Sequence, residues 1–99
     1  MPVYVLLSSL TETGVACVIE EPACLRQISL DIEKLGVKVL AQYATLGQYD
    51  FVHIIDAPDN ETVARVSMEL TAKGNLKPLS MPTISLNDFI SRLSLDRQP

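Results

Sequence analysis

The chain has 99 residues, 47% of them hydrophobic and 5% aromatic, with a formal net charge of −4. Its eight lysines and arginines are scattered and form no basic stripe with aromatic residues, which argues against nucleic-acid binding. No apolar run is long enough for a membrane span or a secretory signal, so we expect a soluble, cytoplasmic protein without a membrane partner.

The N-terminal third of the chain predicts a strand followed by an interrupted helix. Residues 2–9 are apolar and β-branched without a helical period, as in a central strand. Residues 14–35 show a helical pattern, which Thr11 or Thr13 can cap and Pro22 can bend or interrupt.

Two cysteines, Cys17 and Cys24, lie in this helical segment. On one continuous helix they would be roughly 10 Å apart along the axis, which is too far for a disulfide. We therefore expect two free, half-buried thiols in a reducing compartment.

The middle of the chain predicts a β-hairpin. Residues 37–46 and 49–56 are apolar segments, and the Gly-Gln pair at 47–48 between them suits a two-residue type II′ turn. This turn fixes the register of the two strands and places His53, the only histidine of the chain, opposite Gln42.

The C-terminal part predicts a helix, an edge strand and a short last helix. Asp59 caps the first of these helices, and its apolar stripe ends before Gly74. Residues 75–85 form a strand whose two prolines confine it to a sheet edge. Ser85 and Asp88 resemble a capping box for the last helix.

The order of the expected elements is strand, helix, strand, strand, helix, strand, followed by the terminal helix. This is the α+β pattern of the ferredoxin-like βαββαβ sandwich, a four-stranded antiparallel sheet with both main helices on one face. The strands over 2–9 and 49–56 are then central. We expect a single domain over residues 1–95 and a frayed tail over 96–99.

Alternation along the strands sorts their side chains into two faces, and both faces are apolar. The face that we expect the helices to cover contains Val3, Val5, Leu7, Val39, Ala41, Val52 and Ile54. The face that we expect to stay open contains Tyr4, Leu6, Ser8, Leu40, Gln42, Ala44, Tyr49, Phe51, His53 and Ile55. Burying half a dozen such side chains is worth roughly 10 kcal/mol, so a second copy of the sheet is the expected cover. Such a homodimer would enclose a small-molecule cavity.

The sequence TLGQYDFVHIIDAPDNETVA resembles the GYD domain family, whose Gly-x-Tyr-Asp signature is formed here by Gly47, Tyr49 and Asp50. The opening YVLLSSLTETG is similar to the family's first strand and its turn, with Thr11 and Gly14. The resemblance extends over nearly the whole chain and implies a ferredoxin-like fold in the dimeric α/β barrel group. That group includes cofactor-free monooxygenases, isomerases, haem proteins and ligand-sensing modules, so the resemblance implies no single activity.

His53 is the candidate catalytic residue. An imidazole in an apolar cavity can transfer protons near neutral pH or bind a metal or haem iron, whereas a structural histidine forms hydrogen bonds within the sheet or the interface. One histidine supplies too few ligands for a protein-only metal site, and the cofactor stays unknown. Asp50 is expected to accept backbone amide hydrogen bonds near the turn.

Two functions are compatible with these residues, and the sequence leaves open whether the protein is an enzyme. In the first, the protein binds a small apolar ligand and performs cofactor-free proton transfer or oxygenase-type chemistry. His53 would be the acid or base, and the ligand would contact Tyr4, Leu6, Leu40, Gln42, Tyr49, Phe51 and Ile55. In the second, the protein is a non-catalytic oligomeric module that senses a ligand or supports a partner.

Overall fold

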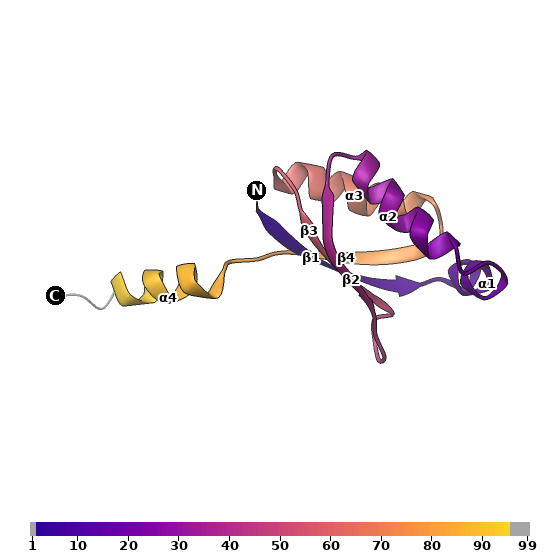
Figure 1. Ribbon diagram of the computed structural model, residues 1–99, viewed down its shortest axis with the longest axis horizontal. Coiled ribbons are helices and arrows are strands. Elements are labelled where there is room, and N and C mark those ends of the chain that lie inside the picture. Colours follow the sequence, from indigo (N-terminus) through magenta and orange to yellow (C-terminus); the bar gives the residue numbers. More distant parts are fainter. Residues whose placement is uncertain (1, 96–99) are drawn as a thin grey trace.

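The computed structural model describes residues 2–95 and contains the predicted strands and helices in the predicted order (Figure 1). The strands are β1 (Val3–Leu10), β2 (Lys38–Ala44), β3 (Phe51–Asp56) and β4 (Leu76–Pro82), and the helices are α1 (Glu12–Glu20), α2 (Cys24–Lys34), α3 (Asn60–Ala72) and α4 (Leu86–Leu95). No described helix is long and apolar enough to cross a membrane. The tail predicted over 96–99 lies outside the described residues.

The strands form one antiparallel sheet in the order β2-β3-β1-β4. β1 and β3 are therefore central, and the proline-containing β4 pairs only with β1 at an edge, as predicted. Helices α2 and α3 lie together on one face of this sheet (Figure 1). The arrangement confirms the α+β, ferredoxin-like prediction.

The expected interruption of the first helix is a complete break at residues 21–23, which separates α1 from α2. Thr11 caps α1 by accepting a hydrogen bond from the Gly14 amide at 3.0 Å. The break brings the two cysteine side chains into hydrogen-bonding contact, so the predicted 10 Å separation is wrong because it assumed one continuous helix. The contact with Cys17, with a smaller effect of burial, raises the pKa of the Cys24 thiol to about 11. Both thiols are free and half-buried, as expected.

Helix α3 begins as predicted, because the Asp59 carboxylate accepts a hydrogen bond from the Thr62 amide at 2.8 Å. The same bond, with one from the Thr62 hydroxyl, lowers the pKa of Asp59. The predicted stripe of Val63, Val66 and Leu70 is buried in the core against the sheet. The sequence pattern alone was sufficient to place this helix and its buried side.

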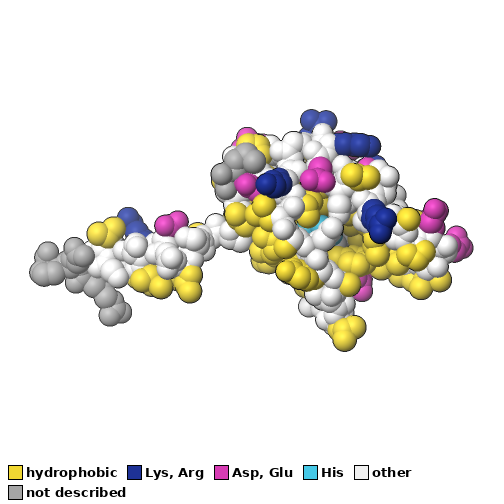
Figure 2. Space-filling view, in the orientation of Figure 1, with side chains coloured by type: hydrophobic (Ala, Val, Ile, Leu, Met, Phe, Trp, Pro, Cys, Tyr) yellow, Lys and Arg dark blue, Asp and Glu magenta, His cyan; other side chains and the backbone are white. Residues whose placement is uncertain are grey.

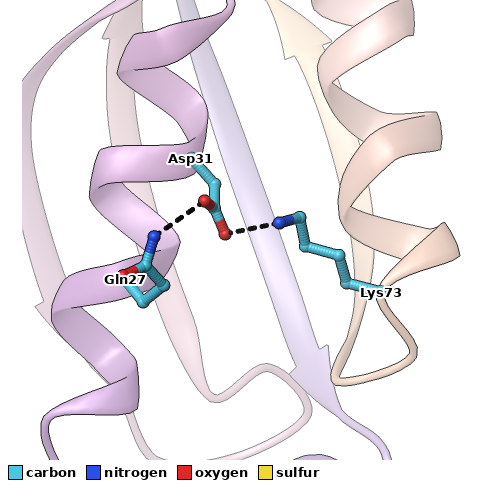
Figure 3. Close-up of polar contacts among 3 residues, drawn as sticks. All are labelled: Gln27, Asp31 and Lys73. Atoms are coloured by element: carbon cyan, nitrogen blue, oxygen red, sulfur yellow. Dashed lines mark hydrogen bonds and ion pairs between the residues drawn. The ribbon is translucent and has the colours of Figure 1, made fainter.

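A polar contact ties α2 to the C-terminal end of α3 (Figure 3). The Asp31 carboxylate accepts a hydrogen bond from Gln27 Nε2 at 2.9 Å and forms an ion pair with Lys73 Nζ at 3.0 Å. These two contacts together lower the pKa of Asp31, and the bond from Gln27 makes the larger contribution. Asp31 thus joins the two helices that cover the sheet.

The hairpin between β2 and β3 has the predicted register but a longer loop. Gln42 lies opposite His53, as expected. The two-residue turn is wrong, because the strands already end at residues 44 and 51. The Thr45 amide donates to the Asp50 carbonyl at 2.8 Å, and Gly47 takes a φ of 107° within the loop, a conformation that favours glycine.

The predicted assignment of the two sheet faces is reversed. The side that was expected to stay open is covered by α2 and α3, and it buries Tyr4, Leu6, Ser8, His53 and Ile55. The side that was expected to carry the helices is uncovered. A register shift between Val39 and Ala41 also moves Val39 onto the helix side, where it packs against the core. Because both sets of side chains are apolar, alternation separates the sets but does not decide which set the helices cover.

Candidate functional site

The uncovered side of the sheet is a continuous apolar surface, which we call the open face. Its apolar strand-paired side chains are Val3, Val5, Leu7, Ala41, Tyr43, Val52, Ile54, Leu79 and Met81. None of these nine is fully buried. The polar residues Lys38, Asp56, Ser9 and Lys77 pair on the same side of the sheet towards the strand ends. Figure 2 shows apolar side chains gathered on the side of the body away from α2 and α3. The structure therefore keeps an open apolar face, as the sequence predicted, but with the other set of residues.

Helix α4 is a second uncovered apolar surface. It lies away from the body at the end of an extended connection, and every one of its residues is exposed (Figure 1). Four of its five apolar residues occur at spacings of three, one and three, so they form one stripe: Leu86, Phe89, Ile90 and Leu93. The Ser85 hydroxyl accepts a hydrogen bond from the Asp88 amide at 3.2 Å, as the predicted capping box requires.

Several residues expected to bind a ligand between two sheets lie in the hydrophobic core instead. Leu6 and Ile55 are fully buried beneath the helices. Tyr4 is also buried, and its hydroxyl donates to Asn60 Oδ1 at 2.6 Å. Leu40 lies at the register shift in β2 and is half exposed. Tyr4, Leu6 and Ile55 face the helices, so they cannot line a cavity between two facing sheets. The predicted position of these three residues is therefore wrong.

Three other predicted site residues do come together, in a pocket beneath the first turns of α2. The pocket has a volume of about 190 Å³, and His53, Gln42 and Phe51 line it from the sheet. Leu25, Arg26 and Ile28 line it from α2. Tyr49 and Leu40 do not contribute to it. The sequence prediction missed the α2 residues because it placed this side of the sheet against a second subunit.

His53 is almost completely buried at this pocket, with 4% of its surface exposed. Its Nδ1 atom has no hydrogen-bond partner within residues 2–95. Burial lowers the pKa of the imidazole, so His53 is neutral at pH 7. Gln42, the expected partner, accepts a hydrogen bond from the Ser29 hydroxyl instead. A proton-transfer role for His53 would therefore rest on the imidazole alone.

The signature residue Asp50 has a structural role of the kind predicted. Its carboxylate accepts a hydrogen bond from the Leu10 amide at 2.8 Å, and its own amide donates to the Ser8 carbonyl at 2.8 Å. These bonds attach the hairpin loop to the end of β1. Asp50 therefore supports the fold and takes no part in the pocket.

The turn at Thr11 and Gly14 is also structural. Thr11 donates through its amide to the Asn75 carbonyl at 3.1 Å and through its hydroxyl to the Gly74 carbonyl at 2.6 Å. Gly14 packs so tightly here that an added Cβ atom would overlap the Asn75 carbonyl oxygen. A glycine at this position therefore permits the close approach of α1 to the start of β4.

Comparison with known proteins is consistent with this architecture. The GYD domain family model matches residues 4–93, from β1 into α4. A protein from Thermus thermophilus is 38% identical over 94 residues, which cover 94% of this chain and 99% of that protein. That relative is named "Glutamine synthetase and cystathionine beta-lyase binding protein".

Proposed function

This chain belongs to the GYD domain family, and we propose that it is a non-catalytic homodimeric module that binds metabolic enzymes through α4. The observation that carries the proposal is the apolar stripe of α4, which no described part of the chain covers. We place this function in the cytoplasm, where the unbridged thiols of Cys17 and Cys24 stay reduced. The enzyme partners that we infer are glutamine synthetase and cystathionine beta-lyase, by analogy with the relative's name.

The exposure of α4 supports a docking role. The four stripe residues keep between 48% and 71% of their surface exposed. An isolated helix of about ten residues is marginal in water, because its few internal hydrogen bonds barely offset the cost of nucleation. Such a helix is stabilised when its apolar side enters a groove of another protein, as amphipathic recognition helices do. The stripe has the spacing that this mode of recognition uses.

The share of the relative that aligns with this chain supports an enzyme as the binding partner of α4. The alignment covers 99% of the relative, so that protein consists almost entirely of the region shared with this chain. The relative's enzyme-binding residues therefore lie in a region that has a counterpart here. Within that region, α4 of this chain has only exposed residues and projects farthest from the body (Figure 1).

The size and composition of the open face support a homodimer in which the open faces of two copies pack together. Four strands about 4.8 Å apart and about seven residues long form a flat area of roughly 450 Å², and side chains standing on it enlarge the accessible area. The flat area alone is a little over half of the roughly 800 Å² per partner of a standard interface. The nine apolar residues of the open face are uncharged, and the charged residues on this side of the sheet, Lys38, Asp56 and Lys77, lie at the strand ends. An identical face can therefore meet the apolar residues while these charges stay at the polar rim of the interface. Each homodimer would then present two α4 helices.

Binding to purified enzymes tests the proposal. The full chain is immobilised, and glutamine synthetase and cystathionine beta-lyase from the source organism are applied separately in biolayer interferometry. Phe89→Asp puts a charge in the middle of the apolar stripe and should weaken binding at least thirtyfold, or about 2 kcal/mol, because a buried aromatic anchor is lost. Ser91→Asp adds the same charge on the polar side of α4 and is the matched control. Unchanged affinity of Phe89→Asp, or no binding by the wild type, would refute the enzyme-docking role.

Light scattering after size exclusion tests the homodimer separately. The wild type should be a dimer at micromolar concentration, and Leu79→Asp should make it a monomer because the charge would be buried between the sheets. Met68→Asp, at an exposed position of α3 on the other side of the sheet, should stay dimeric. A monomeric wild type would exclude the homodimer and would leave the test of enzyme binding unaffected.

A further inference from the structure

We propose that the pocket beneath α2 binds a small carboxylic acid with an aromatic or branched apolar body. Gln42, Phe51 and His53 line the pocket from the helix side of the sheet, and Tyr43 of the open face lines it at the edge strand β2. This site is distinct from α4, and the inference does not depend on enzyme binding. Its parts are a buried polar base, apolar walls and a cationic rim.

The base of the pocket is His53. Its Nδ1 atom is buried without a hydrogen-bond partner among the described residues, and the ring as a whole is 4% exposed. A neutral imidazole has one N–H donor and one acceptor nitrogen. Less than 1 Å² of Nδ1 itself is accessible, so a ligand in the pocket would meet the rest of the ring. The inner end of the ligand would therefore pack against a neutral imidazole ring.

The walls define the size and the character of the ligand. Leu25 and Ile28 of α2 and Phe51 of β3 give the pocket an apolar lining. Its volume of about 190 Å³ is somewhat larger than the roughly 150 Å³ of an apolar cavity that holds benzene. A single aromatic ring with one or two small substituents therefore fits within it. Phe51 can stack on such a ring.

The arginine at the rim of the pocket indicates the charge of the ligand. Arg26 lies at the pocket and is exposed, and within residues 2–95 it has no ion pair or hydrogen bond. The helix positions three and four residues away on either side hold Pro22, Ala23, Ser29 and Leu30, so no acidic neighbour on α2 neutralises it. A free guanidinium binds a carboxylate through two parallel hydrogen bonds. The ligand therefore has its carboxylate at the mouth of the pocket.

Nuclear magnetic resonance titration of the full chain tests this site with defined probes. Benzoate, 4-hydroxybenzoate and the uncharged isostere benzamide are added separately, and amide and His53 ring resonances are followed. We expect saturable shifts for the two acids around α2, β2 and β3, and a shift of the His53 ring, which lines the pocket. Arg26→Gln should weaken benzoate binding about fivefold and leave benzamide binding unchanged, since only the carboxylate uses the guanidinium.

Three results of these titrations would contradict the proposed ligand site. Arg26 is exposed, so Arg26→Gln should fold normally, and an unchanged affinity for benzoate in this variant would overturn the carboxylate assignment. Equal binding of benzamide and benzoate by the wild type would overturn it as well. Shifts that stay linear to high concentration or spread over the open face would show that the pocket is not a ligand site. Lys34→Gln removes one positive charge from the same helix outside the pocket and is the control for general charge effects. It should leave benzoate binding unchanged.

Discussion

Replacing Gly14 by alanine tests the close contact between α1 and β4. Helix propensity alone predicts that this substitution stabilises α1 by about 1 kcal/mol. The structure predicts the opposite sign, because the new Cβ would lie 3.1 Å from Leu10 Cδ2 and would overlap the backbone carbonyl oxygen of Asn75. Overpacking of this kind costs about 1 to 3 kcal/mol.

The movement that relieves the overlap would also disturb the two hydrogen bonds from Thr11 to residues 74 and 75. Each such bond contributes about 0.5 to 1.5 kcal/mol. After the gain in propensity is subtracted, the net loss is about 1 to 5 kcal/mol. For a domain of this size that corresponds to a fall in Tm of roughly 5 °C or more.

Urea denaturation followed by circular dichroism measures this loss at one fixed protein concentration, because a dimer would make the transition depend on concentration. Thr13→Ala, an exposed change in the same helical turn, is the control and should change stability by less than about 0.7 kcal/mol. A Gly14→Ala variant as stable as the wild type, or more stable, would refute the packing argument.

Three further predictions concern single side chains. Asp50→Ala should lower the free energy of unfolding by about 1.5 to 3 kcal/mol, because the Leu10 amide loses a charged acceptor, whereas Asp50→Asn keeps an acceptor oxygen and should cost less; equal losses measured in urea would contradict this. Burial lowers the pKa of His53 from 6.5, so the unfolded chain binds more protons than the folded chain below that value. Stability should therefore be highest above pH 6.5 and fall towards pH 5.5, and urea titrations of His53→Gln should lack this component. The raised pKa of Cys24 predicts slow alkylation by iodoacetamide at pH 8, and Cys17→Ala, which removes the hydrogen-bond partner, should speed up the reaction at Cys24 in mass spectrometry.

Local patterns in the sequence correctly predicted features that depend on residues close together in the chain. Asp59 and Ser85 were predicted as caps, and both accept the expected amide hydrogen bonds. Pro22 marked the break between α1 and α2, although the spatial consequence for the cysteines was missed. The register of the hairpin was also correct, since the short connection leaves little freedom for strand pairing.

The candidate site was predicted only in part. His53, Gln42 and Phe51 were selected because alternation places them on one side of the sheet, and the structure does bring them together. Arg26 was passed over as one of several scattered cations. Its position at the rim depends on how α2 packs over β2 and β3, and no local pattern in the sequence encodes that packing.

The sequence by itself determined which segments form strands and helices, how the strands pair, and that the domain has more apolar surface than its own helices can cover. Only the tertiary structure decided which set of strand residues the helices bury and that α4 projects from the body. The physical reason is that a period-two pattern separates the side chains into two sets without ranking them. When both sets are apolar, burial favours either face by a similar amount, and the choice is made by the path of the connections and the packing of whole helices.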